Sequence, residues 1–501
     1  MTDAPLDMAA LDADPDAAQL WNPDLAPTVA AMRTWTWVNI SALWVGMVIC
    51  VPAYLLASGL ILQGMAWWQA MLTVLLGNLV VLVPMLLVGH AGARYGVPFP
   101  VLARSSFGTV GARLPGLLRG LVACGWFGIQ TWVGGFAIYQ ILNGVSDGFF
   151  VGERLPLIDI DTAQFLSFLA FWALQVWFIA KGIESIRWLE TLAAPFLLLA
   201  LIALLVWAYV SANGFGEMLS QPSQFVPGGA REGQFWRVFW PSLTAMVGFW
   251  STLSLNIPDF TRFARSQRDQ VIGQAIGLPV PMGMLAFISV AVTSATVGVF
   301  GSAIWDPVEI AGRLGGAAAL FGLVLLLLAT MTTNLAANVV APANGFSNFA
   351  PRQISFRTGG YITAGLGIVI MPWKLLESAG SYLFVWLVGY SSLLGPIAGI
   401  LVADYFGVRG CRLDVAALYR RRGIYEYFHG WNLRALVALA LGVAPSLPGF
   451  LTTVGLVDNA PAGLVRLYDY AWFVGAFTSG IAYYLLMRLG SGTKTPAAVH
   501  R

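Results

Sequence analysis

Long apolar stretches follow one another along most of the chain and are separated by short polar or basic segments. A membrane-spanning helix needs about 20 predominantly apolar residues, and we identify twelve stretches that can meet this requirement. The predicted spans are residues 35–61, 67–89, 115–143, 162–181, 187–211, 236–258, 271–300, 315–340, 358–372, 380–404, 433–453 and 468–487.

The overall composition agrees with this pattern. Hydrophobic residues make up 58% of the chain and charged residues only 10%, whereas about a quarter of the residues of a soluble protein are charged. The mean hydropathy is +0.74. We therefore expect an all-α polytopic membrane protein with twelve transmembrane helices, whose partners include the lipid bilayer and no nucleic acid.

The distribution of basic residues predicts the orientation. With a cytoplasmic N-terminus, 21 of the 27 lysines and arginines fall on the inner side and 6 on the outer side, as the positive-inside rule requires. The first 20 residues are acidic and polar, so no cleavable signal peptide is expected. Both termini are predicted to be cytoplasmic, in a membrane that we take to be the bacterial inner membrane. Nothing in the sequence indicates the oligomeric state.

Proline and glycine interrupt two of the spans near their centres. Span 1 contains Gly46 and Pro52, and span 6 contains Gly248 and Pro258. Proline lacks an amide hydrogen and frees a carbonyl one turn earlier, and in lipid this carbonyl needs a partner such as a bound cation. Each interruption could also be an ordinary kink. Two of them, five spans apart, favour an inverted-repeat transporter of five plus five helices with broken helices 1 and 6 and two extra C-terminal helices.

This interpretation divides the chain into six segments. They are a cytoplasmic tail (1–33), a first inverted repeat (34–211), a second inverted repeat (212–405), a basic cytoplasmic loop (406–432), spans 11 and 12 (433–488) and a cytoplasmic tail (489–501). We expect the basic loop to be a solvated connector, because charge runs usually are.

Polar side chains within the spans are the second indication of a binding site. Gln130 follows Trp126 by one helical turn, which places an amide and an indole on one face. Span 8 carries Thr332, Thr333 and Asn338. An amide can read the ring amides of a flat heterocycle, and an indole can stack on such a ring. Each tryptophan could instead be a packing residue, and each threonine could bond back to its own helix.

Few titratable residues lie at mid-membrane depth. Asp259 and Glu190 occur near span ends, where capping or pairing with arginine explains them. The three cysteines and three histidines show no metal-ligand spacing. A cage of neutral oxygens for Na⁺ therefore suits the sequence better than a proton relay. The spans also lack a catalytic constellation, so we do not expect an enzyme; a channel would differ from a transporter by conducting without saturable uptake.

Several ordered motifs together resemble the nucleobase:cation symporter-1 family of hydantoin, allantoin, uracil, cytosine and purine permeases. The resemblance runs from residue 22 to the end of span 10. The motifs that carry it are NPDLAPT, YGVPFPVLARSSFG, LLRGLVACGWFGIQTWVGG, KGIESIRWLE, NIPDFTRF, TNLAANVVAPAN and GPIAGILVADYF.

The resemblance implies roles for individual residues. The substrate would lie between the indoles of Trp126 and Trp250 and be read by Gln130, Asn338 and the backbone of Gly248 or Phe249. The sodium site would comprise the carbonyls of Gly46, Ile49 and Ala329 and the hydroxyls of Thr332 and Thr333. Span 10, with Gly380, Gly389 and residues 382–387, would form a thin gate. Cys50 stands where the hydantoin transporter has glutamine, so hydantoin specificity does not carry over directly.

The function that the resemblance implies is secondary active symport by alternating access. The substrate would be a nucleobase or a related amide-ring or ureide compound such as uracil, allantoin, hydantoin or cytosine, and the co-transported ion would be Na⁺. The alternative within the family is a proton-coupled permease for a purine, a pyrimidine or a thiamine-like compound.

Overall fold

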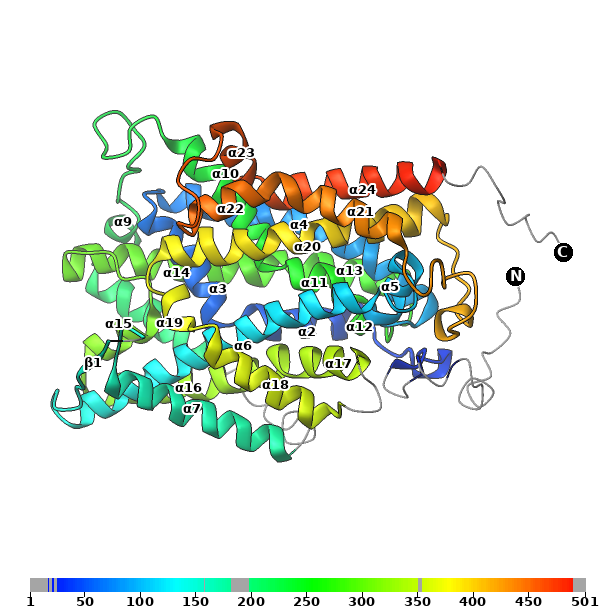
Figure 1. Ribbon diagram of the computed structural model, residues 1–501. Helices are drawn as coiled ribbons and strands as arrows, with labels where there is room; N and C mark the ends of the chain where they lie inside the picture. Colours follow the sequence, from blue (N-terminus) through cyan, green and yellow to red (C-terminus); the bar gives the residue numbers. More distant parts are fainter. Residues whose placement is uncertain are drawn as a thin grey trace.

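The structure is a computed structural model that describes residues 17, 20–21, 25–156, 158–181, 198–349 and 354–489. The described chain is built almost entirely from helices that run side by side (Figure 1). The strands within it are β1 (Arg154–Leu155) and β2 (Ile160–Asp161), which pair antiparallel between α6 and α7. The predicted all-α class is confirmed.

The described residues of the first half of the chain form a short 3₁₀ segment and a series of helices. They are η2 (Ala30–Met32), α2 (Trp37–Val48), α3 (Val51–Leu62), α4 (Trp67–Tyr95), α5 (Phe99–Phe107), α6 (Arg113–Val145), α7 (Thr162–Lys181) and the helix Leu198–Ser211. Of the KGIESIRWLE motif, only Lys181 belongs to the described residues. Glu190 lies outside them.

The second half contains more short helices between the long ones. They are α9 (Phe215–Met218), α10 (Phe235–Phe249), α11 (Ser251–Asn256), α12 (Pro258–Thr261), α13 (Gln267–Gly277), α14 (Pro279–Phe300), α15 (Pro307–Leu314), α16 (Gly316–Asn338), α17 (Val340–Phe349), α18 (Phe356–Val369), α19 (Pro372–Leu375), the π-helical η3 (Ser381–Leu387), α20 (Val388–Val402) and the π-helical η4 (Ala403–Val408). The last part comprises η5 (Ala417–Tyr419), α21 (Leu433–Val443), η6 (Ala444–Ser446), α22 (Leu447–Thr453), α23 (Ala462–Tyr468) and α24 (Ala471–Leu489).

The predicted break in span 1 is present. The helices α2 and α3 meet at Ile49 and Cys50 with a bend of 61°. Pro52 is the second residue of α3, a position whose amide hydrogen would have no intrahelical partner in any case. Proline therefore starts the second half-helix rather than distorting the first.

Span 6 is interrupted at Trp250, two residues after the predicted Gly248. Trp250 separates α10 from α11 with φ −97° and ψ 4°, values outside the α-helical region. Pro258, the second predicted breaker, is the first residue of α12. The glycine thus lies inside α10, and the residue that leaves the helix is the indole predicted to bind substrate.

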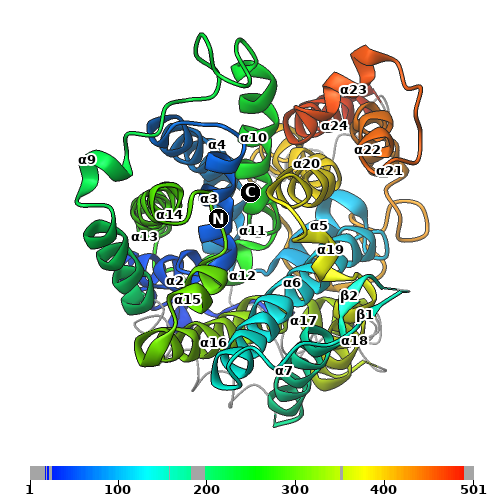
Figure 2. The same cartoon turned by 90° about the vertical axis from the view of Figure 1, so that its left-hand side faces the viewer.

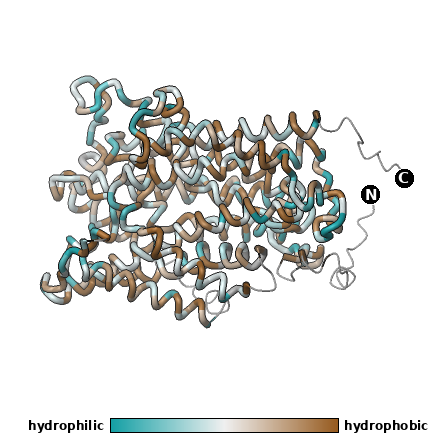
Figure 3. Tube along the Cα trace, viewed as in Figure 1, coloured by the Kyte–Doolittle hydropathy of each residue, from teal (hydrophilic) through white to brown (hydrophobic). Residues whose placement is uncertain are grey.

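Some of the twelve predicted spans are helices whose length and hydropathy allow them to cross a membrane. Six helices of the described residues are long and apolar enough to cross a membrane, or eight if each of two strongly bent pairs is one span. The second bent pair is α23 with α24, at 93°. The helices Leu198–Ser211 and Ala319–Leu335 are apolar but shorter, and the number twelve stays a prediction. Figure 3 shows hydrophobic colouring along the helices and hydrophilic colouring mostly in the loops at their ends.

Two groups of helices make up most of the molecule when it is viewed end-on (Figure 2). In one, α6 contacts each of α7, α16 and α18, and the other contains α2, α3, α4, α10, α13 and α14. The helices α20, α21 and α24 pack together on a third side. Elements of the first two groups meet where α6 and α16 approach the broken helices, so the predicted site residues lie between the groups.

The expectation of a solvated basic loop was wrong at its two ends, whereas the central residues 420–424 are exposed. Arg409 donates through Nε to Asp404 at 2.8 Å and through Nη2 to the hydroxyl of Tyr427 at 2.6 Å. Asp404 also accepts from Ser105 (2.9 Å), Ser106 (3.1 Å) and Tyr483 (2.7 Å). The segment after span 10 is therefore anchored to α5 and α24 by a buried carboxylate that the charge pattern did not reveal.

Asp259 has a capping role, as expected, but it caps a different helix. Its Oδ1 accepts the backbone N–H of Phe99 at 2.8 Å, at the start of α5. A carboxylate at a helix N-terminus satisfies an unpaired N–H and the helix dipole.

Candidate substrate and cation site

Trp126 on α6 lies at the centre of a cluster of aromatic rings. Its ring centroid is 5.2 Å from that of Phe249 on α10, 5.8 Å from Trp386 on η3, 6.2 Å from Tyr390 on α20 and 6.3 Å from Tyr382 on η3, all in edge-to-face geometry. Trp126 is only 6% exposed. The cluster thus joins α6 to the broken span 6 and to the predicted gate of span 10.

Trp250 is held by different neighbours. Its Nε1 donates to the side-chain oxygen of Asn78 on α4 at 2.9 Å, and its ring packs edge-on against Trp44 at 5.3 Å. The ring contacts of the described residues include none between Trp126 and Trp250, whereas Phe249 contacts both, at 5.2 and 4.8 Å. Phe249, predicted to contribute its backbone, therefore also places its ring between the two indoles.

Gln130 presents an unused hydrogen-bond acceptor one turn beyond Trp126. The side chain is 4% exposed, and its Oε1 is buried with no hydrogen-bond partner. Leaving a buried acceptor unpaired costs about 1–3 kcal/mol. A polar atom of this kind is free to accept a hydrogen bond from a bound molecule.

Asn338 is the last residue of α16 and belongs to a buried chain of amides. Its Nδ2 donates to the side-chain oxygen of Asn334 at 2.9 Å. Asn334 in turn donates to Gln175 on α7 at 2.8 Å and to the backbone carbonyl of Phe127 at 3.0 Å. Sequence reasoning missed Asn334 and Gln175, although Asn334 lies one turn before Asn338 in the same motif.

Gly248 is required by close packing. A Cβ there would lie 2.8 Å from the carbonyl oxygen of Leu387, and the Gly248 carbonyl accepts from the Tyr390 hydroxyl at 2.8 Å. The Tyr390 and Leu387 contacts hold the end of α10 against span 10. No local pattern indicates Tyr390, because its role depends on a helix far away in the chain.

The break in span 1 frees main-chain oxygens. In an unbroken helix the Gly46 carbonyl would accept from the N–H of Cys50, but this N–H donates to Val48 at 2.9 Å instead. Ile49 ends α2 with φ −77° and ψ 84°. Cys50 begins α3 as its N-cap and is a buried free thiol.

The other half of the predicted cation site lies on α16, which contacts α2. The Thr332 hydroxyl donates to the carbonyl of Ala329 at 2.8 Å, which is the back-bonding common to membrane threonines. A hydroxyl bonded in this way keeps lone pairs for a cation. Thr333 is half-buried. No group of three or more His, Cys, Asp or Glu that could hold a metal occurs among the described residues, and neutral oxygens suit Na⁺.

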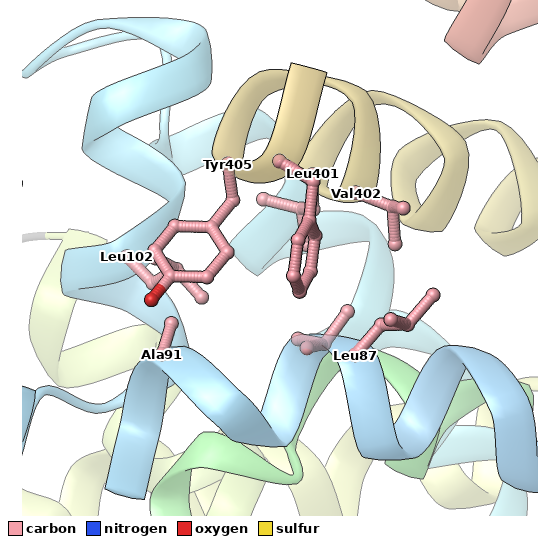
Figure 4. Close-up of a pocket in the computed structure, with 8 residues that line it drawn as sticks. Leu87, Ala91, Leu102, Leu401, Val402 and Tyr405 are labelled. Atoms are coloured by element: carbon pink, nitrogen blue, oxygen red, sulfur yellow. The ribbon is translucent and has the colours of Figure 1, made fainter. Parts of the chain in front are cut away.

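A small apolar pocket lies away from these residues, between α4, α5 and the end of span 10 (Figure 4). Leu87, Leu102, Leu401 and the ring of Tyr405 point into it. The Tyr405 hydroxyl is hydrogen-bonded to His90 at 3.0 Å. Since the lining offers almost no polar group, the pocket does not suit an amide-bearing substrate.

Comparison with known proteins decides the family. Residues 27–475 match the model of a family described as permeases for cytosine/purines, uracil, thiamine and allantoin. The chain belongs to this permease family. It is 47% identical to the purine-uracil permease of Arabidopsis thaliana, over 94% of this chain and 78% of the relative, and 39% identical to the allantoin permease of Bacillus subtilis, over 94% of each chain.

Solved structures agree with this assignment. A nucleobase-cation-symport-1 family transporter in a closed conformation with bromovinylhydantoin bound has a TM-score of 0.72 at 29% identity, over 94% of this chain and 96% of that one. An inward-facing structure of the same transporter, Mhp1, has a TM-score of 0.75 at 28% identity, over 94% of each chain. The predicted family and transporter fold are confirmed, and this permease is a multi-pass membrane transporter and not an enzyme.

Proposed function

We propose that this permease is a symporter that imports a nucleobase or a related amide-ring or ureide compound by alternating access, with Na⁺ as the coupled ion. The observation that carries the proposal is the buried, unpartnered Oε1 of Gln130 beside the indole of Trp126. The relatives' named substrates (purine, uracil, allantoin) and the bound bromovinylhydantoin all carry ring or ureide N–H groups. Such groups match an empty acceptor beside a flat aromatic face.

The substrate would lie between Trp126 and Trp250, with Gln130, Asn338 and the Gly248–Phe249 backbone at its edge. Phe249 contacts both indoles, so its ring must turn aside when a substrate enters. The Cys50 thiol lies in the break of span 1 and is a weak hydrogen-bond partner. The choice among the individual compounds then depends on the shape of the pocket.

The test of the substrate site is the variant Gln130→Ala. Since Gln130 Oε1 has no partner in the fold, its removal should leave the melting temperature unchanged while reducing uptake affinity about tenfold, the worth of a hydrogen bond of roughly 1.4 kcal/mol. Uptake of labelled uracil, cytosine, allantoin, hydantoin, hypoxanthine and a thiamine-like pyrimidine would be compared in proteoliposomes. Gln140→Ala, half-buried further along α6, is the matched control. Wild-type affinity in Gln130→Ala for every transported compound would refute the site.

Sodium coupling is supported by the freed carbonyl of Gly46 and by the neighbouring hydroxyls on α16. Replacement of Na⁺ by choline at fixed pH should abolish concentrative uptake. Thr333→Ala should raise the Na⁺ concentration needed for half-maximal uptake several-fold, because one oxygen ligand is lost, and Thr333→Ser should restore it. Undiminished uptake in choline would exclude sodium.

Proton coupling is the second candidate, and one residue favours it. Asp306 precedes α15 beyond the end of α14, and burial, as the largest cause, raises its pKa to about 7. A carboxyl that titrates near neutrality can carry a proton. Proton coupling requires uptake that persists in choline, collapses with a protonophore and is lost in Asp306→Asn.

A further inference from the structure

We propose that Gln175 on α7 is a positioning residue for substrate recognition: through Asn334 it fixes the amide of Asn338 so that the Asn338 carbonyl oxygen faces the substrate. A substrate must then offer an N–H at that point. The inference rests on the proposed function, because it takes Asn338 to line the site.

The argument starts at a main-chain carbonyl, which can only accept. The carbonyl of Phe127 on α6 accepts from the Thr131 hydroxyl at 2.6 Å and from the Asn334 side chain at 3.0 Å. The atom of Asn334 that faces it must therefore be Nδ2, because an oxygen there would meet another acceptor. The same nitrogen is 2.8 Å from Gln175 Oε1.

The orientation of Asn334 determines that of Asn338. With Nδ2 towards Phe127 and Gln175, the Oδ1 of Asn334 faces Asn338, which lies one turn later on the same face of α16. Only the Nδ2 of Asn338 can donate to this oxygen, and it does so at 2.9 Å. The Asn338 Oδ1 consequently points away from the chain of amides.

Gln175 completes the arrangement from α7. Its Nε2 donates to the Thr131 hydroxyl oxygen at 2.9 Å while its Oε1 accepts from Asn334. Gln175, Asn334 and Thr131 are fully buried, and Asn338 is 7% exposed. Because a buried amide with a reversed orientation would place acceptors against acceptors, and unpaired buried groups are unfavourable, a single orientation dominates. No side chain among the described residues donates to Asn338 Oδ1.

This geometry predicts a preference for N–H donors. A parent compound and its N-methyl derivative share the same ring and carbonyls, but the derivative is larger by one methyl group and cannot donate from that nitrogen. A site built to pair a buried acceptor with a donor rejects the analogue that lacks it. We expect one of the two monomethyl derivatives of a transported ring to bind at least about tenfold more weakly than its parent, which corresponds to about 1.4 kcal/mol.

The experiment measures the ratio of dissociation constants for N-methylated and parent ligand in detergent-purified permease. The probes are uracil, 1-methyluracil and 3-methyluracil, and hydantoin with its 1-methyl and 3-methyl derivatives. Gln175→Leu removes one of the two acceptors of Asn334 Nδ2. It also removes the donor that keeps the Thr131 hydroxyl directed at the Phe127 carbonyl, so this hydroxyl can donate to a reversed Asn334, and Asn338 can then turn its Nδ2 outwards. We expect the discrimination ratio to fall to within about threefold, with weaker binding of the parent. Gln175→Glu keeps an oxygen towards Asn334 and should retain the ratio.

Gln274→Leu is the matched control, because Gln274 is fully buried on α13 and donates to Gln270 at 2.6 Å. It should leave the ratio unchanged. An unchanged ratio in Gln175→Leu would overturn the proposal. If that variant does not fold, Thr131→Val is measured instead, because it removes the hydroxyl that holds Gln175. An unchanged ratio in Thr131→Val would also overturn the proposal.

The outcomes separate this inference from the proposed function. If the wild-type permease binds none of the parent compounds, the proposed substrate class fails. If it binds a parent compound but also binds both methyl derivatives equally well, the proposed function stands and the orientation of Asn338 is refuted.

Discussion

At the scale of one residue, burial disfavours the charged form of the Asp306 carboxyl group. Its Oδ1 caps α15 by accepting the N–H of Val308 at 2.8 Å. Burial opposes ionisation, and the pKa rises from 3.8 to about 7. Hydrogen bonds from the backbone of Val308 and Glu309 lower it only in part.

The pH dependence of stability follows from this pKa. The unfolded chain loses the Asp306 proton near pH 4 and the folded protein near pH 7, so the contribution of Asp306 is present below pH 4 and is lost as the pH rises through about 7. Asp306→Asn keeps a capping oxygen and should remove the decrease in stability that Asp306 causes as the pH rises from 4 to 7. Melting temperatures between pH 4 and 8 would show it. Asp161→Asn, which changes another capping aspartate, should leave the slope in place; an identical slope in Asp306→Asn would contradict the prediction.

At the scale of the helix, the two broken spans differ in how closely their glycines are packed. In span 1 the interruption exposes main-chain oxygens at Gly46, and a Cβ at Gly46 would have no neighbour within 4 Å. In span 6 the chain leaves the helix at Trp250, while Gly248 allows α10 to approach span 10 closely. One glycine is therefore tolerant of a side chain and the other is not.

The variants Gly46→Ala and Gly248→Ala separate these roles. Gly248→Ala should destabilise the permease by about 1–3 kcal/mol through overpacking against the Leu387 carbonyl and should weaken substrate binding by shifting Phe249 and Trp250. Gly46→Ala should be neutral or stabilising by about 0.5–1 kcal/mol, because alanine favours the helix and the Gly46 carbonyl is kept. Thermal unfolding in detergent measures both, and equal melting temperatures for the two variants would disprove the difference.

At the scale of the whole molecule, the buried carboxylate of Asp404 connects parts of the chain that are far apart in sequence. It accepts from α5, from α24 and from Arg409 in the basic loop. Arg409 is also close to the ring face of Tyr425, at 4.7 Å. The ion pair is well shielded, with side-chain exposures of 0% for Asp404 and 15% for Arg409.

Asp404→Asn should therefore destabilise the permease strongly. It leaves the Arg409 guanidinium buried without a counter-charge, and such a change costs about 3–5 kcal/mol. Glu309→Gln is the control, because Glu309 pairs with Arg313 at the surface and an exposed pair is worth about 0–1 kcal/mol. Melting temperatures of the two variants in one detergent provide the measurement. A loss in Asp404→Asn no larger than in Glu309→Gln would show that the cluster is not a structural anchor.

The sequence by itself determined the membrane class, the positions of most helices and the break in span 1. The physical reason is that lipid leaves no solvent for unpaired backbone groups, so apolar length and proline position largely dictate where helices run. Helical spacing also placed Trp126 and Gln130 on one face of span 3, and the structure buries both side chains.

Only the tertiary structure decided how these residues are arranged. Phe249 contacts both indoles, Gln175 fixes Asn338 through Asn334, and Asp404 anchors a loop that the charge pattern described as solvated. Each of these contacts joins helices that are far apart in the chain, and no local pattern encodes which helix faces which. The break in the first helix could therefore be predicted from the sequence. The orientation of the Asn338 amide, which is expected to bind the substrate, could not.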